Sequence, residues 1–282
     1  MTSITLSPGL KGTEFEPQKV SWSSKDVMLY ALGVGSKPGD ELDFLYERRG
    51  PKVLPTYAVI PGMRAMGNIG KTIELDVARL LHGEQSVEIH RPLPPEAELI
   101  MTSRISEVWD KGKAAVIGVE ANFSDDEGLL FSTRSTLFYL GAGGFGGESG
   151  PSTRMLNLPP ERDPDLIVSY LTQEEQGALY RLSGDRVALH IDPAFAEKAG
   201  YARPFMHGLC TFGFVGRAAL QGLCAGDPEL FISFGGRFSQ RVEFGDEIRT
   251  RIWHTAPGEA ILQAVTQDGK VVLSQAKATF KV

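Results

Sequence analysis

The chain has 282 residues, roughly twice the commonest domain length, so two modules or one large one are both allowed. It is 42% hydrophobic and 23% charged, as in globular proteins, and its net charge of -6 argues against a nucleic-acid partner, which needs a basic face. No apolar run reaches the ~18 residues of a membrane span, and the N-terminal MTSITLSPGLKGTEFEP has no basic start or apolar run, so we expect a cytoplasmic protein.

The first half of the chain reads as a helix followed by antiparallel strands. A helix should begin after Ser24, because apolar residues recur at helical spacing from Val27 until Gly33 and Gly35 end the pattern. Residues 53–60 are rich in strand-forming residues but contain a proline, which predicts an edge or kinked strand. Further strands are predicted at residues 86–91, 99–108, 114–123 and 129–140.

The second half starts after a glycine cluster at residues 141–152 and a proline-rich linker. Thr172 and Glu175 are spaced as a capping box, and Asp192 before Pro193 predicts a short helix. Residues 207–223 are apolar on most sides, which fits a helix wrapped by a sheet. Strands are predicted at residues 230–234, 238–244, 247–254 and 259–266, with 271–280 as a last edge.

The two cysteines, Cys210 and Cys224, lie in the same apolar segment, so we expect buried thiols and neither a disulfide framework nor a zinc site. The glycine cluster does not sit between a strand and a helix of a βαβ unit, which excludes a dinucleotide-binding interpretation. Together the patterns predict an α+β protein, with helices packed on antiparallel sheet, in two similar modules of residues 1–150 and 151–282.

Chemistry-bearing residues are densest in residues 180–193, where Asp185 and His190 are five positions apart. A carboxylate and an imidazole that converge can hold a water, remove its proton and return a proton to a neighbouring carbon, as conjugate hydration requires. Taken alone, the spacing favours a turn aspartate and a structural histidine, because geometry and not spacing decides a catalytic assignment.

Residues 179–217 closely resemble the hydratase domain of MaoC-like enoyl-CoA hydratases. That family's pattern reads Gly-Asp-x-Asn-Pro-Leu-His, then Asp-Pro, and later Pro-x-x-His-Gly. The N-terminal half is similar to the family's first module in LYALGVG, LPTYAVIP, LLHGEQSVEIHRPLP and GAGGFGG. The residues that match the hydratase pattern are Gly184, Asp185, Leu189, His190, Asp192, Pro193, Pro204, His207 and Gly208.

The resemblance implies a tandem, or double, hot-dog fold, in which each half is a long helix wrapped by a curved antiparallel sheet. It implies that the first module has lost its site and receives the acyl group, while the second keeps the site. The implied reaction is hydration of a trans-2-enoyl-CoA to an (R)-3-hydroxyacyl-CoA, in β-oxidation of fatty-acid or other acyl side chains, without a metal or other cofactor. Asp185 and His190 would share the acid and base roles, and the Gly208 amide would bind the thioester oxygen, aided by the helix dipole.

One departure from the family matters: Val187-Ala188 stands where the family has Asn-Pro. Valine has no side-chain hydrogen bond to offer, and losing one such contact typically costs on the order of a hundredfold to a thousandfold in turnover. Another group can replace the asparagine, the pocket can be adapted to an unusual acyl group, or the protein can bind acyl-CoA with little turnover. A 3-hydroxyacyl-acyl-carrier-protein dehydratase is a further alternative, because the reaction is reversible.

Other expectations concern the substrate and the assembly. We predict Val187, His207 and Arg237 as substrate contacts, with Arg203, Arg241 and Lys198 as weaker candidates for the CoA phosphates. The other histidines, at 82, 90 and 254, are expected to have packing or surface roles. Family members commonly pair, so the resemblance implies a homodimer.

Overall fold

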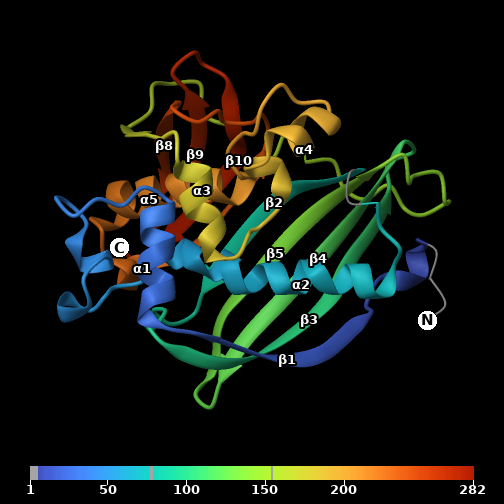
Figure 1. Ribbon diagram of the computed structural model, residues 1–282, viewed down its shortest axis with the longest axis horizontal. Helices are drawn as coiled ribbons and strands as arrows, with labels where there is room; N and C mark the ends of the chain where they lie inside the picture. The colour runs from blue at the N-terminus through green and yellow to red at the C-terminus, as the bar shows by residue number, and fades with distance from the viewer. Residues whose placement is uncertain (1–5, 77–78, 154) are drawn as a thin grey trace.

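A computed structural model of the chain describes residues 6–76, 79–153 and 155–282. The described residues form a curved ten-stranded sheet in the order β1-β3-β4-β5-β2-β7-β10-β9-β8-β6, and every strand pair is antiparallel. The long helices lie against this sheet (Figure 1). The α+β architecture predicted from the sequence is therefore confirmed.

The first half of the sheet carries α2 (Val59–Thr72) across the strands (Figure 1). In β3, apolar side chains such as Leu99, Met101 and Ile105 are buried, while most residues between them face solvent, so one face of this half is core and the other is water-facing. The remaining elements of this half are β1 (Glu14–Trp22), α1 (Ser24–Gly33), β2 (Leu80–Ile89), β3 (Ala97–Asp110), β4 (Ala114–Asp125) and β5 (Gly128–Leu140).

The second half repeats this strand order around α5 (Gly208–Cys224), which is buried along most of its length as its apolar sequence predicted. The halves join where β2 pairs with β7, in a register that places Glu84 opposite Arg237. The boundary between residues 150 and 151 stays a prediction. The other elements are β6 (Leu166–Leu171), α3 (Gln176–Tyr180), α4 (Pro193–Lys198), β7 (Phe231–Phe238), β8 (Glu247–Ala256), β9 (Glu259–Thr266) and β10 (Val271–Phe280).

Three strand predictions are wrong. Residues 53–60 are not a strand: a 3-10 turn at Pro55–Ala58 leads directly into α2, because a proline in the first turn of a helix costs no hydrogen bond. Residues 239–244 lie outside any strand, since β7 extends to Phe238 and the chain then turns. The strand Val271–Phe280 is not an edge, because it pairs with β7 on one side and β9 on the other.

The predicted capping box also fails. The Thr172 hydroxyl donates to the Asp246 carbonyl at 2.9 Å, and α3 begins only at Gln176. By contrast, Asp192 does cap α4, accepting from the Ala194 N–H at 2.9 Å, and Cys210 and Cys224 are buried free thiols, both as predicted.

The backbone of the glycine cluster after β5 forms hydrogen bonds with the carboxylate of Asp110. Asp110 accepts hydrogen bonds from the N–H groups of Gly112, Gly144 and Gly146 at 2.8, 2.8 and 2.9 Å. These bonds hold the pKa of Asp110 below its usual value. At Gly143 an added Cβ would lie 2.5 Å from the Gly112 carbonyl oxygen, so the close approach of the two segments requires glycine there.

Candidate active site

The segment between α3 and α5 carries the residues singled out from the sequence. After a 3-10 turn at Arg181–Ser183, the chain turns at Gly184, whose φ of 137° favours glycine. A second 3-10 turn, Ala188–His190, follows Asp185 and brings His190 back toward it. The two side chains are close enough for the charge of each to shift the pKa of the other, so the structure brings the predicted pair together.

His190 has a defined orientation and tautomer. Its Nδ1 lies 2.8 Å from the Phe205 carbonyl oxygen, which can only accept, so Nδ1 carries the proton and Nε2 keeps its lone pair. Burial lowers the pKa of His190, while the Phe205 carbonyl and Asp185 act in the opposite direction. A neutral imidazole with a free Nε2 can accept a proton from water.

Asp185 supplies the carboxylate of the pair. Burial raises the pKa of this carboxyl, and its neighbour His190 and the N–H of Val187, which donates to it, act in the opposite direction. Val187 thus contributes its backbone to the site, while its side chain is 51% exposed.

His207 lies beneath this pair and is fully buried. Its ring is 4.0 Å from that of His190 and 5.0 Å from that of Tyr180, centroid to centroid. Its Nε2 donates to the backbone carbonyl of Asp185 at 3.1 Å. The contacts of His207 are with protein groups, and its predicted role as a substrate contact stays a prediction.

Gly208 begins α5 directly after His207, which stands at the N-cap position but makes no side-chain cap hydrogen bond. The N–H groups of a first helical turn have no partner within the helix, and the helix dipole adds partial positive charge there. An added Cβ at Gly208 would lie 3.5 Å from the Phe238 ring, so this ring packs against one side of the start of α5.

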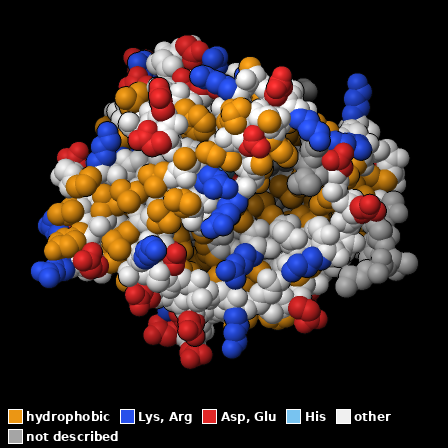
Figure 2. Space-filling model, in the orientation of Figure 1, with side chains coloured by type: hydrophobic (Ala, Val, Ile, Leu, Met, Phe, Trp, Pro, Cys, Tyr) orange, Lys and Arg blue, Asp and Glu red, His pale blue; other side chains and the backbone are white. Residues whose placement is uncertain are grey.

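Apolar groups from the first half of the chain approach the same segment. An added Cβ at Gly184 would lie 3.6 Å from the Met63 methyl carbon and 3.8 Å from Ile60, both on α2. On the surface of the molecule, hydrophobic side chains gather around a hollow above α2, with Lys and Arg side chains at its margin (Figure 2). Leu182 and Ile191, 50% and 40% exposed, add further apolar surface close to Asp185 in the chain.

The remaining candidates are dispersed. Arg237 lies 3.8 Å from Glu84 and donates to the Thr153 hydroxyl at 3.2 Å, which leaves it partly engaged within the protein. The contacts of His82 and His90 agree with the packing or surface roles expected for them: His82 packs edge-on to Phe238 at 5.0 Å, and the exposed His90 lies 3.3 Å from the Ser132 hydroxyl. Phe205, Phe238 and Tyr180 were not predicted from the sequence, because the residues around an aromatic side chain in the sequence do not show what it packs against in the fold.

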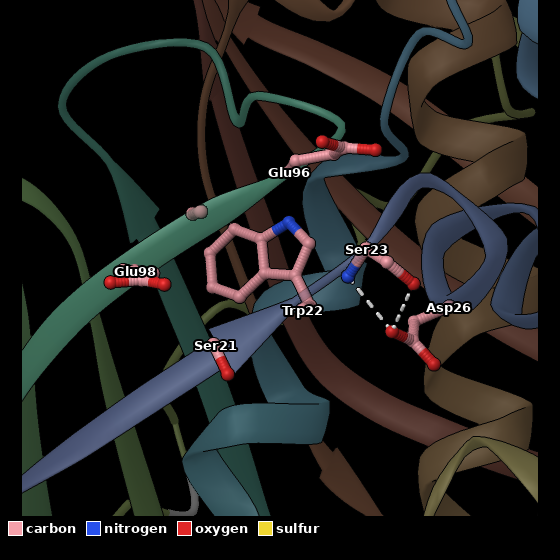
Figure 3. Close-up of a pocket in the computed structure, with 7 residues that line it drawn as sticks. Ser21, Trp22, Ser23, Asp26, Glu96 and Glu98 are labelled. Atoms are coloured by element: carbon pink, nitrogen blue, oxygen red, sulfur yellow. Dashed lines mark hydrogen bonds between the residues drawn. The ribbon is translucent and has the colours of Figure 1, made fainter.

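A separate surface pocket of about 580 Å³ lies where β1 ends and β3 begins (Figure 3). Asp26, Glu96 and Glu98 give it an acidic lining, and the Asp26 carboxylate caps α1 by accepting from the Ser23 N–H and hydroxyl (Figure 3). Its lining contains none of the residues that the sequence pattern selected.

Two family descriptions match the chain in succession. Residues 20–141 match the MFE-2 hydratase 2 N-terminal domain, and residues 156–276 match the MaoC-like domain. An enoyl-CoA hydratase of Mycobacterium tuberculosis, ChsH3, is 37% identical over 284 residues, which cover 93% of this chain and 94% of that protein. The chain belongs to the MaoC-like hydratase family.

Solved structures and a further sequence relative agree with the assignment to this family. A MaoC-like dehydratase from Phytophthora capsici superposes with a TM-score of 0.88 at 30% identity, covering 99% of this chain and 98% of the other. A peroxisomal enoyl-CoA hydratase 2 of Arabidopsis thaliana is 39% identical over 83% of this chain and 82% of its own length. A more distant Mycobacterium tuberculosis protein, 15% identical with a TM-score of 0.59, is described as a double hot-dog, and the MaoC-like chain has this fold.

No helix in the described part of this MaoC-like chain is long and apolar enough to cross a membrane.

The buried His207 should make the MaoC-like chain sensitive to acid. Burial, followed by the neighbouring His190, lowers the pKa of His207 from 6.5 to about 3. Between these values the unfolded chain binds a proton that the folded chain does not, so stability is complete above pH 6.5 and falls as the pH drops toward 3. This one group should remove about 2 kcal/mol of the unfolding free energy between pH 7 and pH 5.

Urea unfolding of the wild type and of His207→Gln at the two pH values checks this. The other groups, including Asp185, whose raised pKa acts in the opposite direction, cancel in the comparison. The variant should lose less stability than the wild type on acidification, and equal losses would contradict the assignment.

Proposed function

We propose that the protein is an (R)-specific 2-enoyl-CoA hydratase that adds water to trans-2-enoyl-CoA and forms (R)-3-hydroxyacyl-CoA. The observation that carries the proposal is the convergence of a partly buried carboxylate, Asp185, and a neutral, oriented imidazole, His190, beside the start of α5. Relatives of nearly the same length named enoyl-CoA hydratase and 3-hydroxyacyl-thioester dehydratase support it.

In the proposed reaction, Asp185 and the Nε2 of His190 hold one water between them. As the water oxygen bonds to the β-carbon of the enoyl group, one of its protons passes to the pair, and a proton passes from the pair to the α-carbon. The C=C double bond becomes a C–C single bond, so one water is consumed and no redox change occurs. Because Asp185 and His190 titrate together, we assign the acid and base roles to the pair.

Negative charge moves to the thioester oxygen while the new C–O bond forms. The N–H of Gly208, at the positive end of α5, would donate a hydrogen bond to this oxygen and stabilise its charge. The acyl group extends toward Ile60 and Met63 of α2, which offer apolar contacts and no polar group that could compete for the water.

The decisive test is the loss of enoyl absorbance when purified protein meets trans-2-enoyl-CoA thioesters of short, long and branched acyl groups. Oxidation of the product by an (R)-specific but not an (S)-specific 3-hydroxyacyl-CoA dehydrogenase would establish the stereochemistry. Binding of several thioesters without turnover would favour an acyl-CoA-binding protein, to which Val187 in place of asparagine points. Faster turnover of the matching acyl-carrier-protein thioesters would favour a 3-hydroxyacyl-acyl-carrier-protein dehydratase.

Replacing Val187 with the asparagine of the family pattern tests whether the absence of that amide lowers turnover. The Val187 N–H donates to the Asp185 carboxylate and the Val187 side chain is half exposed, so Val187→Asn introduces an amide close to the site in the chain without removing core packing. We expect kcat to rise about tenfold, since one preorganised polar contact is worth at least that much. Val187→Leu is the matched control and should leave kcat near the wild-type value. A fall in kcat for the asparagine variant would instead mean that the pocket is adapted to an apolar group at this position.

We also propose that the catalytic module is residues 151–282, that residues 1–150 form the acyl-receiving module, and that the protein acts in the cytoplasm as a homodimer. Arg237, Val187 and His207 stay proposed as substrate contacts. Light scattering of the purified protein measures the assembly directly.

A further inference from the structure

The strongest unassigned feature of the site is His207, which touches both the segment that carries the acid and base and the helix that carries the oxyanion donor. We propose that His207 is a positioning residue: by donating to the Asp185 carbonyl, it fixes the Asp185 carboxylate at a set distance from the Gly208 amide. The inference rests on the proposed function and deepens it, because it assigns a role to a residue that does not itself exchange protons.

The hydrogen bond defines the tautomer of His207. A backbone carbonyl oxygen can only accept, so the Nε2 that lies 3.1 Å from the Asp185 oxygen carries the proton. His207 precedes Gly208 directly in the chain, and its own backbone carbonyl accepts from the Thr211 N–H at 3.1 Å, which fixes it at the N-cap of α5. One residue therefore connects the Asp185 loop to the rigid start of the central helix.

Two other roles for His207 fit the contacts less well. As a helix cap it would accept from N–H groups of α5 through its side chain, yet it makes no such bond, and histidine is not a favoured cap. As an acid or base it would need a path for protons, yet its Nδ1 is buried and has no hydrogen-bond partner in the described structure. The charged and titratable groups around it are Asp185, His190, Tyr180 and Arg181.

The neutral ring also suits the pair that it supports. His207 lies 4.0 Å from the His190 ring, and a positive charge there would oppose protonation of His190. Burial holds the pKa of His207 at about 3, so the ring stays neutral at working pH and contributes a hydrogen bond and a flat packing surface. Displacement of a catalytic group by about 1 Å can cost on the order of a hundredfold in rate, so the anchor of Asp185 should matter for turnover.

Two substitutions separate the hydrogen bond from the packing. His207→Phe keeps a flat ring against His190 but removes the donor to Asp185. His207→Gln removes the ring, but its amide nitrogen can occupy the position of Nε2 and donate the same hydrogen bond. We expect kcat for trans-2-enoyl-CoA to fall 10- to 100-fold in the phenylalanine variant with KM changed less than threefold, and to recover to within about fivefold of wild type in the glutamine variant.

The pH profile adds a readout that a purely structural role would not move. Loss of the anchor should let water reach Asp185 and shift the acid limb of kcat/KM to lower pH in His207→Phe, but not in His207→Gln. Carbon-13 NMR of labelled aspartate gives the same pKa without turnover. Nitrogen-15 NMR of the wild-type histidines should show the Nε2–H tautomer of His207, neutral down to pH 5.

The possible results separate this inference from the proposed function. If the wild type hydrates no thioester, the function is wrong, yet the two NMR measurements still decide whether His207 anchors Asp185. If the wild type is active and both variants lose kcat equally, or if only the amount of folded protein changes, the hydrogen bond has no positioning role and the inference is overturned.

Discussion

Hydration should fall at least about a hundredfold when Asp185 is replaced by asparagine, with the fold intact. The substitution keeps the size of the side chain and removes the charge that accepts a proton, and a positioned acid or base is worth about a hundredfold to ten-thousandfold. Because the Asp185 carboxyl is already costly to bury in its charged form, as its raised pKa shows, the neutral amide should not destabilise the protein. The measurement is kcat and KM for trans-2-enoyl-CoA at neutral pH.

The pH profile of the wild type belongs to the same prediction. Burial raises the pKa of Asp185, so its protonation should reduce kcat/KM at a pH above the ordinary aspartate value of about 3.9. Asp192→Asn is a matched control, because the same chemical change at the cap of α4 preserves an equally good cap. Activity of Asp185→Asn within tenfold of this control would remove Asp185 from the reaction.

The strongest local patterns predicted the correct elements. In α5 and β3 the buried positions are occupied by apolar residues, so the pattern of apolar residues in the sequence shows which positions are buried. The edge strands β1 and β6 were missed, because an edge needs little apolar surface: in β6 every residue is partly or fully exposed. The helix α2 was missed because its sequence contains several glycines and a proline, and only packing on the sheet makes it stable.

The site was predictable in part, for a related physical reason. Asp185 and His190 are five residues apart, so a short loop is enough to bring them together. The partners of these residues come from distant positions: the Phe205 carbonyl orients His190, and the Ile60 and Met63 side chains approach Gly184 from α2. Such contacts depend on how the two halves of the sheet join, which no local pattern encodes.

The largest effect on stability is expected from substitution of Arg217, because this residue links the two halves of the chain. This side chain on α5 is 3% exposed, and its Nε lies 2.7 Å from a carboxylate oxygen of Glu41 in the first half. It also donates to the Val34 carbonyl at 2.6 Å, and its guanidinium lies 3.7 Å from the centre of the Tyr170 ring on β6. Arg217 therefore binds a loop of the first half to the central helix of the second.

Arg217→Met should lower the free energy of unfolding by about 3–5 kcal/mol, because it leaves the Glu41 carboxylate, whose side chain is only 12% exposed, and the Val34 carbonyl without their Arg217 partner. Urea unfolding at pH 7 measures the loss. The double variant Arg217→Met/Glu41→Gln should be more stable than the single variant, since the uncompensated charge is gone, and the coupling between the two positions follows from the complete mutant cycle. If the single variant lost less than about 1 kcal/mol, the ion pair would behave like an exposed surface pair, and the two halves would be held together mainly by the β2–β7 pairing and the apolar surface around α5.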